Sequence, residues 1–103
     1  MVLLKENRRL LTYSRLASLS YLDYYGKDGV MYKELKSALG LSDSQLGPQL
    51  LWLKEKGYVK TAPQKLDEKE LSVYYITEKG KIAYKSIVEW IKTIPIYDNL
   101  RGD

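Results

Sequence analysis

The fold of this chain is decided by residues 30–60, VMYKELKSALGLSDSQLGPQLLWLKEKGYVK. The stretch 32–39 within it places Leu35 and Leu39 on one side of a helix, because residues three and four apart share a helix face. Gly40 follows directly, and glycine is the residue type that ends helices most readily. This part of the sequence therefore predicts a short amphipathic helix that stops at Gly40.

A second helix is expected to begin almost at once. Ser42 and Gln45 form an S-x-x-Q pattern, in which each side chain bonds a backbone N–H at the start of a helix. The helix is predicted over about 43–56, ends at Gly57, and turns a stripe of leucines to the core. These leucines are Leu46, Leu50 and Leu53. Two helices joined by so short a turn form a helix-turn-helix unit, here over about 32–57.

The segments around this unit have patterns of their own. Leucines recur at helical spacing over residues 8–25, which predicts a preceding helix. Strands are predicted at 58–61 and 71–76, and the polar stretch APQKLDEKE at 62–70 is expected to be a solvated loop between them. The two strands would form a wing over about 58–76.

A last helix is expected over about 78–94, with Thr77 as its N-cap and Pro95 marking its end. Residues 30–31 form a short extended piece. The chain is therefore expected to be one domain, 1–103, mainly α-helical with a small antiparallel β-hairpin. The order helix, helix, helix, wing, helix defines a winged helix-turn-helix.

The composition limits the possible chemistry. The 103 residues include no cysteine and no histidine, which excludes disulfides, thiolate nucleophiles and the usual zinc sites. Because the commonest general base is also missing, we expect no enzyme activity, no metal and no cofactor. Lys and Arg number 17 against 13 acids, so the net charge of +4 mildly favours a polyanionic partner.

No targeting or membrane segment is apparent in the sequence. The apolar run at the N-terminus is far too short for the core of a signal peptide. No stretch approaches the length of a membrane span. We therefore expect a soluble, cytoplasmic protein without membrane contact.

Three motifs in this sequence resemble the MarR- and ArsR-like winged-helix regulators, particularly small archaeal ones. They are ELKSALGLS at 34–42, LKEKGYV at 53–59 and YYITEKGK at 74–81. The resemblance implies a transcription regulator whose second helix of the unit enters the major groove of duplex DNA while the wing touches its backbone. It also implies a dimer that contacts two half-sites.

The helix over about 43–56 carries polar side chains that we expect to face the bases. Gln45 has the amide needed to bind adenine bidentately, and Ser44 can contact a base edge or a phosphate. Gln49, at the flank, either reaches DNA or supports the turn. This face lacks the Arg or Lys that usually contacts guanine and phosphate. Pro48 inside the helix predicts a kink or a separately wound first turn.

Contacts with DNA phosphates are expected from lysines on the helix-turn-helix and the wing, each adding salt-dependent affinity. These residues are Lys33, Lys36, Lys54, Lys60, Lys65 and Lys69. Asp67, Glu68 and Glu70 offset part of the wing's positive charge. The wing is therefore expected to hold the backbone less tightly than an arginine-tipped wing.

The first and last helices carry more apolar surface than a core of this size needs, which predicts a homodimer. The residues expected at its interface are Tyr21, Tyr25, Tyr84, Ile87, Val88, Trp90, Ile91 and Ile94. The tyrosine-rich helix ends are where an effector would bind, although the sequence identifies none.

Two alternatives to a sequence-specific regulator remain open. Leu51 and Trp52 either pack within the domain or its dimer, dock another protein together with Pro48, or contact thymine methyl groups; packing is the interpretation we favour. A protein-interaction module would use the second of these contacts. An architectural binder without sequence preference would instead rely on the lysines alone.

Overall fold

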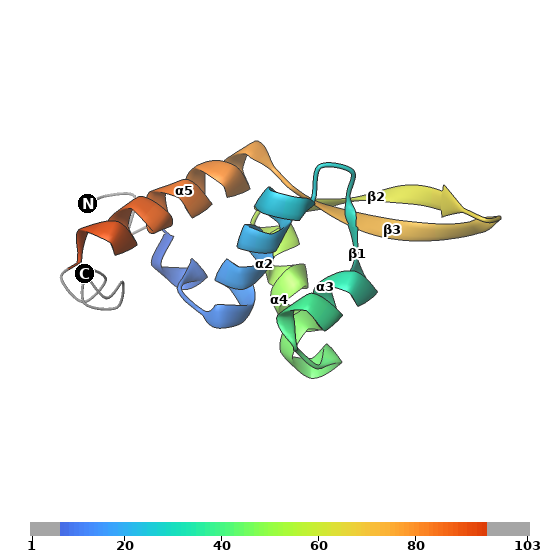
Figure 1. The fold of residues 1–103 in the computed structure, drawn as a ribbon, viewed down its shortest axis with the longest axis horizontal. Coiled ribbons are helices and arrows are strands. Elements are labelled where there is room, and N and C mark those ends of the chain that lie inside the picture. Colours follow the sequence, from blue (N-terminus) through green and yellow to red (C-terminus); the bar gives the residue numbers. More distant parts are fainter. Residues whose placement is uncertain (1–6, 95–103) are drawn as a thin grey trace.

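The computed structural model describes residues 7–94 as one helical body with a projecting β-hairpin (Figure 1). The elements in chain order are η1 (Arg8–Leu10), α2 (Tyr13–Tyr25), β1 (Val30–Met31), α3 (Tyr32–Leu39), α4 (Asp43–Glu55), β2 (Val59–Leu66), β3 (Lys69–Ile76) and α5 (Glu78–Thr93). The predicted winged helix-turn-helix is confirmed, with α3 and α4 as the helix-turn-helix and β2 and β3 as the wing. Its sheet has three strands, because β1 pairs with β3.

The wing is longer than the sequence predicted. All the residues of β2 pair with β3, from Val59 opposite Ile76 to Leu66 opposite Lys69. The expected loop at 62–70 is therefore wrong, since a turn of two residues, Asp67 and Glu68, replaces it. The polar sequence misled because the outer part of the wing lies in solvent and needs no alternating apolar residues.

The expected helix at 8–25 is interrupted. A single 3₁₀ turn, η1, ends at Leu10, and α2 begins at Tyr13 after a new N-cap, the Thr12 side chain, which accepts a hydrogen bond from the Arg15 N–H (3.4 Å). The interruption lets Leu10 enter the core, where it is fully buried. The predicted continuous helix over 8–25 is therefore divided at Leu11 and Thr12, and the leucine spacing did not indicate this division.

The helix α4 starts and continues as one α-helix despite its internal proline. The capping box is confirmed: the Gln45 N–H donates to Ser42 Oγ (3.3 Å) and the Ser42 N–H donates to Gln45 Oε1 (2.9 Å). Pro48 cannot donate to the carbonyl of Ser44, but both residues are exposed, so water can solvate that carbonyl. The predicted kink or separate first turn is thus not needed.

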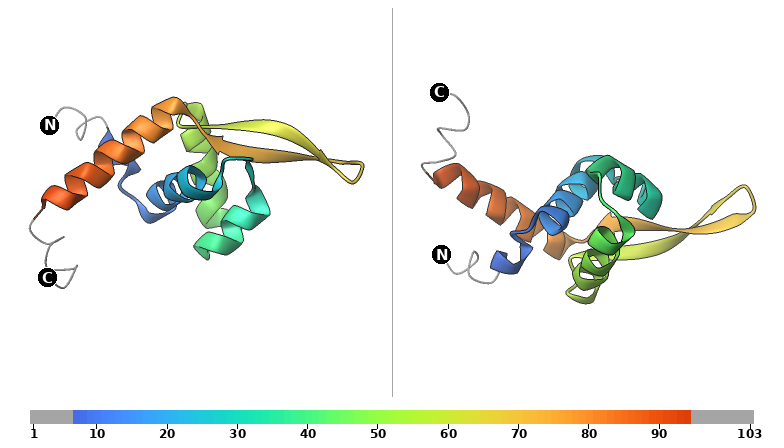
Figure 2. Two further views of the ribbon diagram at one scale, coloured as in Figure 1. Left: turned by 45° about the horizontal axis from the view of Figure 1, so that its top comes forward. Right: turned by 90° about the horizontal axis from the view of Figure 1, so that it is seen from below.

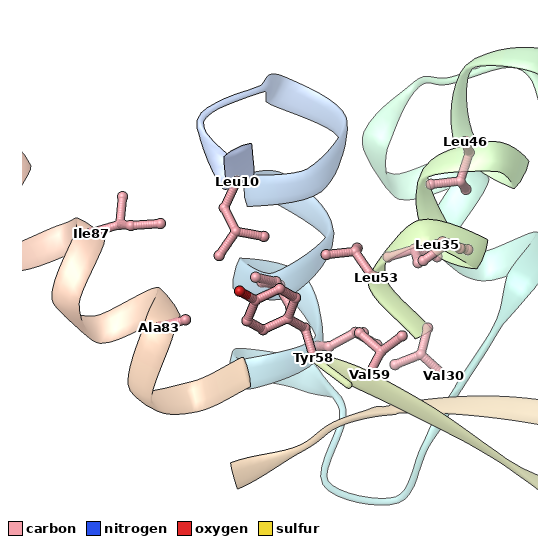
Figure 3. Close-up of a cluster of buried hydrophobic side chains, with 12 residues drawn as sticks. Leu10, Val30, Leu35, Leu46, Leu53, Tyr58, Val59, Ala83 and Ile87 are labelled. Carbon is pink, nitrogen blue, oxygen red and sulfur yellow. The ribbon is translucent and has the colours of Figure 1, made fainter. Parts of the chain in front are cut away.

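The core lies where α2, α3, α4 and α5 meet the base of the wing (Figure 3). Its buried residues are Leu10, Leu19, Leu22, Val30, Leu35, Leu46, Leu50, Leu53, Tyr58, Val59, Ala83 and Ile87. The predicted leucine stripe of α4 contributes three of them. The wing and α5 extend from this core in opposite directions in every view (Figure 2).

The start of α5 is tied to the base of the wing. The Thr77 hydroxyl donates to the Gly57 carbonyl oxygen (2.6 Å) and accepts from the Gly80 N–H (3.0 Å). Gly80 is buried, and a Cβ there would collide with the backbone carbonyl of Tyr58. Glycine is therefore required at this position for close packing of α5.

We predict that Gly80→Ala lowers the free energy of unfolding by about 2–3 kcal/mol, because the added methyl group meets backbone that cannot move aside. Gly47→Ala in α4 is the matched control. Its Cβ would lie 3.7 Å from Tyr32 Oη, an ordinary contact, and should gain about 1 kcal/mol of helix propensity. Urea denaturation of both variants measures the difference; equal effects would contradict this account of Gly80.

Candidate nucleic-acid interface

The helix α4 has one face in the core and the opposite face in solvent. Leu46, Leu50 and Leu53 are at most 1% exposed, which fixes the inner face. At about 100° per residue the opposite stripe consists of Ser44, Pro48, Leu51 and Glu55, all of them exposed. This outward stripe is the surface that a second helix of a helix-turn-helix offers to the major groove.

Ser44 and Gln45 lie near the start of α4 and are both exposed. The Oε1 atom of Gln45 accepts the Ser42 N–H of the capping box, so only the amide NH₂ group remains free. Bidentate contact with adenine needs a donor and an acceptor from the same amide. Gln45 can therefore donate to a base or a phosphate through this NH₂ group, whereas a bidentate contact with adenine requires Oε1 to accept from the base as well as from Ser42.

Gln49 is directed to the interior side of α4. It is half-buried, and its Oε1 accepts a hydrogen bond from Arg15 Nε at 2.7 Å. Of the two roles considered for Gln49, the geometry matches support of the helix and not contact with DNA. The expected base-facing set is thus reduced to Ser44 and Gln45.

The side chain of Arg15 joins three elements. In addition to Gln49, it donates through Nη1 to the Arg9 carbonyl oxygen (2.6 Å), and its guanidinium carbon lies 3.8 Å from the centroid of the Trp52 ring. Trp52 in turn stacks with Tyr58 (centroids 6.1 Å apart), which pairs with the Lys79 ammonium. Arg15 therefore holds η1, α2 and α4 in a fixed arrangement.

Of the alternatives considered for Trp52, these contacts support packing within the domain. The half-buried indole packs within the domain, under Arg15 and beside Tyr58, and a partner need not cover it. Leu51, its neighbour in sequence, is 58% exposed on the outward stripe. Leu51 and Trp52 therefore differ in role. The contact between Arg15 and Trp52 could not be predicted from the sequence, because no spacing rule relates residues so far apart in the chain.

A carboxylate is fixed at the first turn of α4. Asp43 accepts from the Tyr32 hydroxyl (2.8 Å) and pairs with the Lys36 ammonium (3.1 Å). These two donors hold the pKa of Asp43 below its ordinary value, and the same hydrogen bond raises the pKa of Tyr32. A negative charge at the N-terminus of a helix stabilises the helix, here α4. The same carboxylate pairs with Lys36, which was expected to contact phosphate.

The other predicted phosphate-contacting lysines, Lys33, Lys54, Lys60, Lys65 and Lys69, are exposed. On the wing, Lys65 lies opposite Glu70 in the strand register. The wing, 59–76, carries three lysines and three acids, so its net charge is zero. The wing therefore adds no net positive charge, and the charge available to DNA lies on exposed lysines of α3, α4 and the wing.

The residues expected at a dimer interface do not all lie on the surface. Ile87 is fully buried in the chain's own core, so its assignment to an interface is wrong. Helix α5 is apolar on more than one side, and Ile87 is on the side that joins the core next to α2. The remaining seven are half-buried or exposed: Tyr21, Tyr25, Tyr84, Val88, Trp90, Ile91 and Ile94.

Two of these residues border a groove between α2 and α5. The groove has a volume of about 440 Å³ and is mainly apolar, and Tyr84 and Val88 line it together with Leu11, Tyr13 and Leu16. The Tyr84 hydroxyl is 3.0 Å from Ser20 Oγ at its floor. An adjoining hollow is lined by the rings of Tyr21 and Tyr25, which are tilted against one another with their centroids 4.7 Å apart.

Two further properties concern residues 7–94. No helix in this range combines the length and the apolarity that crossing a membrane requires. The same range contains no cluster of acidic side chains arranged to hold a metal ion.

The fold and the exposed stripe of α4 define a winged helix of the DNA-binding type. Residues 14–94 match the winged helix DNA-binding domain family, and the chain belongs to this family. An uncharacterised protein of Methanocaldococcus jannaschii is 31% identical over 64 residues, which is 62% of this chain and 70% of the relative.

MarR-family regulators share the fold. The structure of the Staphylococcus aureus MepR–DNA complex superposes with a TM-score of 0.73 at 15% identity, over 97% of this chain and 78% of MepR. A MarR-family regulator from Silicibacter pomeroyi gives a TM-score of 0.65 at 22% identity, over 95% of this chain and 70% of the regulator. At these identities the similarity concerns the fold.

We predict that Arg15→Lys lowers the free energy of unfolding by about 1–2 kcal/mol, because an ammonium group cannot stack flat on the Trp52 ring while donating to both Gln49 and the Arg9 carbonyl oxygen. The emission of Trp52 should change as well, since its nearest cation moves. Arg9→Lys is the control, because Arg9 contributes a backbone carbonyl to this contact. Thermal unfolding followed by fluorescence tests both variants. An Arg15→Lys variant with unchanged stability would refute the role of Arg15 in joining η1, α2 and α4.

Proposed function

We propose that this protein is a dimeric transcription regulator that binds duplex DNA through α4 and the wing. The observation that supports this most strongly is the outward stripe of α4. It is exposed along the whole helix while the inner stripe is buried, and α4 lies beside a projecting wing. Membership of the winged helix DNA-binding domain family agrees with this use of the helix.

In this proposal Ser44 and the free NH₂ group of Gln45 lie nearest the bases at the N-terminal end of α4. Recognition helices contact base edges with this end. Lys33, Lys54, Lys60, Lys65 and Lys69 contact phosphates, and Lys36 does so only if it leaves Asp43. A protein of this kind acts in the compartment that holds the DNA.

The second subunit would cover the groove between α2 and α5. That groove is mainly apolar and open, and the same helix α5 carries further half-buried apolar side chains in its last turns. Two protomers joined there would each present an α4 helix. Binding of both to one duplex requires a separation of about 34 Å, one turn of DNA, or a multiple of it.

Binding to DNA should fall steeply with salt, because each phosphate contact releases counterions. A dimer making about six such contacts loses about a thousandfold in affinity between about 50 and 200 mM salt. We predict that Lys65→Ala weakens binding to all sequences alike and flattens the slope, whereas Lys92→Ala on α5 changes neither. A mobility-shift titration measures this; binding that is absent at low salt, or insensitive to salt, would refute the function.

Dimerisation is tested by a charge placed in the groove. Val88→Lys should convert a dimer into monomers, since a partner would have to bury an unpaired ammonium group. Ile82→Lys, on the same helix but 56% exposed and outside the groove, should leave the dimer intact. Sedimentation equilibrium distinguishes them. A dimer that survives Val88→Lys, or that Ile82→Lys dissociates, would place the interface elsewhere.

A further inference from the structure

The outward stripe of α4 lacks the side chains that usually recognise bases. Between Asp43 and Glu55 the helix has one basic residue, Lys54, and it lies to the side of the stripe. The amide oxygens of Gln45 and Gln49 are engaged by Ser42 and Arg15. Contact with guanine, which takes a bidentate Arg or Lys, has no candidate on this stripe.

The hydrogen-bonding groups that remain are few. Ser44 is close to another hydroxyl, with its Oγ 3.1 Å from Ser42 Oγ. Pro48 has no N–H to donate. Glu55 is at the C-terminal end of α4, away from the end that usually contacts bases. Hydrogen bonds to bases are therefore limited to the Ser44 hydroxyl and the free NH₂ group of Gln45, and they can account for only part of any sequence preference.

Leu51 occupies the middle of this stripe and is 58% exposed. The core does not require it, because Leu50 and Leu53 already bury that side of the helix at 1% and 0% exposure. The ring of Pro48 lies one turn away on the same side, so the centre of the stripe is apolar. In the major groove of unmodified DNA, the only apolar group that a base presents is the C5-methyl group of thymine.

We propose that Leu51 is a specificity-determining residue that recognises thymine through its methyl group, so that the preferred target is A·T-rich duplex DNA. This inference rests on the proposed function, since it places α4 in the major groove. Recognition then depends on burying methyl groups in addition to the few hydrogen bonds that Ser44 and the NH₂ group of Gln45 can make. Each buried methyl group should contribute about a factor of four in affinity, or about sixteenfold for a dimer that buries two.

Removing the methyl group from the DNA tests the proposal without knowledge of the operator. The probes are an alternating dA·dT duplex and the same duplex with deoxyuridine in place of every thymidine. They present the same hydrogen-bonding groups and differ in the C5-methyl group. We expect the wild-type protein to bind the thymine duplex at least fourfold more tightly at low salt, measured by fluorescence anisotropy.

Two matched variants assign the preference to a residue. Leu51→Ala should bind both duplexes equally, because the shortened side chain no longer reaches the thymine methyl group. A preference caused by DNA shape alone would instead persist in this variant. Ile82→Ala removes a similarly exposed aliphatic side chain (56%) on α5, away from α4 and the wing, and it should keep the wild-type preference. Both positions are exposed, so neither substitution should disturb folding, which circular dichroism verifies.

The outcomes separate this inference from the function on which it depends. Salt-dependent binding with equal affinity for both duplexes would overturn the role of Leu51 and leave DNA binding standing. A preference that survives Leu51→Ala would likewise overturn it and assign the discrimination to DNA shape. Failure to bind either duplex at low salt would overturn the proposed function together with the inference.

Discussion

The burial of three leucines of α4 is the constraint on which the rest of the structure depends. Leu46, Leu50 and Leu53 are withdrawn from water at a stabilisation of about 2 kcal/mol each. Their burial fixes the rotation of the helix about its axis, and therefore fixes which residues face outward. Because Leu50 and Leu53 face the core, Leu51 lies on the opposite side of the helix and is exposed.

Polar contacts then hold the flanks of α4, and they use groups that would otherwise be free to contact DNA. The capping box engages the amide oxygen of Gln45, and Arg15 engages that of Gln49. Lys36 similarly pairs with Asp43. Each contact stabilises the position or the start of the helix, but each also removes one acceptor or one cation from the interface. As a result, the position of α4 is fixed, but its outward stripe has few groups that can form hydrogen bonds with bases.

Charge is distributed in keeping with this picture. The wing is electrically neutral and the net charge of the chain is only +4, so one protomer has little electrostatic attraction for a polyanion. A second protomer doubles the number of phosphate contacts on one duplex. The groove between α2 and α5 and the outward stripe of α4, which has no basic residue, therefore support the same proposal, in which dimerisation compensates for the few phosphate contacts of each subunit.

Local signals in the sequence determined the helix-turn-helix. The spacing of leucines, the Ser42–Gln45 capping box and the glycines after α3 and α4 act within a few residues, so the order of elements and the inner face of α4 follow from them. Contacts between distant segments decided the rest. The pairing that extends the wing, the break before Tyr13, the burial of Ile87 and the contact of Arg15 with Trp52 depend on which elements meet in space. No periodicity encodes such meetings, because packing against a remote partner leaves no fixed spacing along the chain.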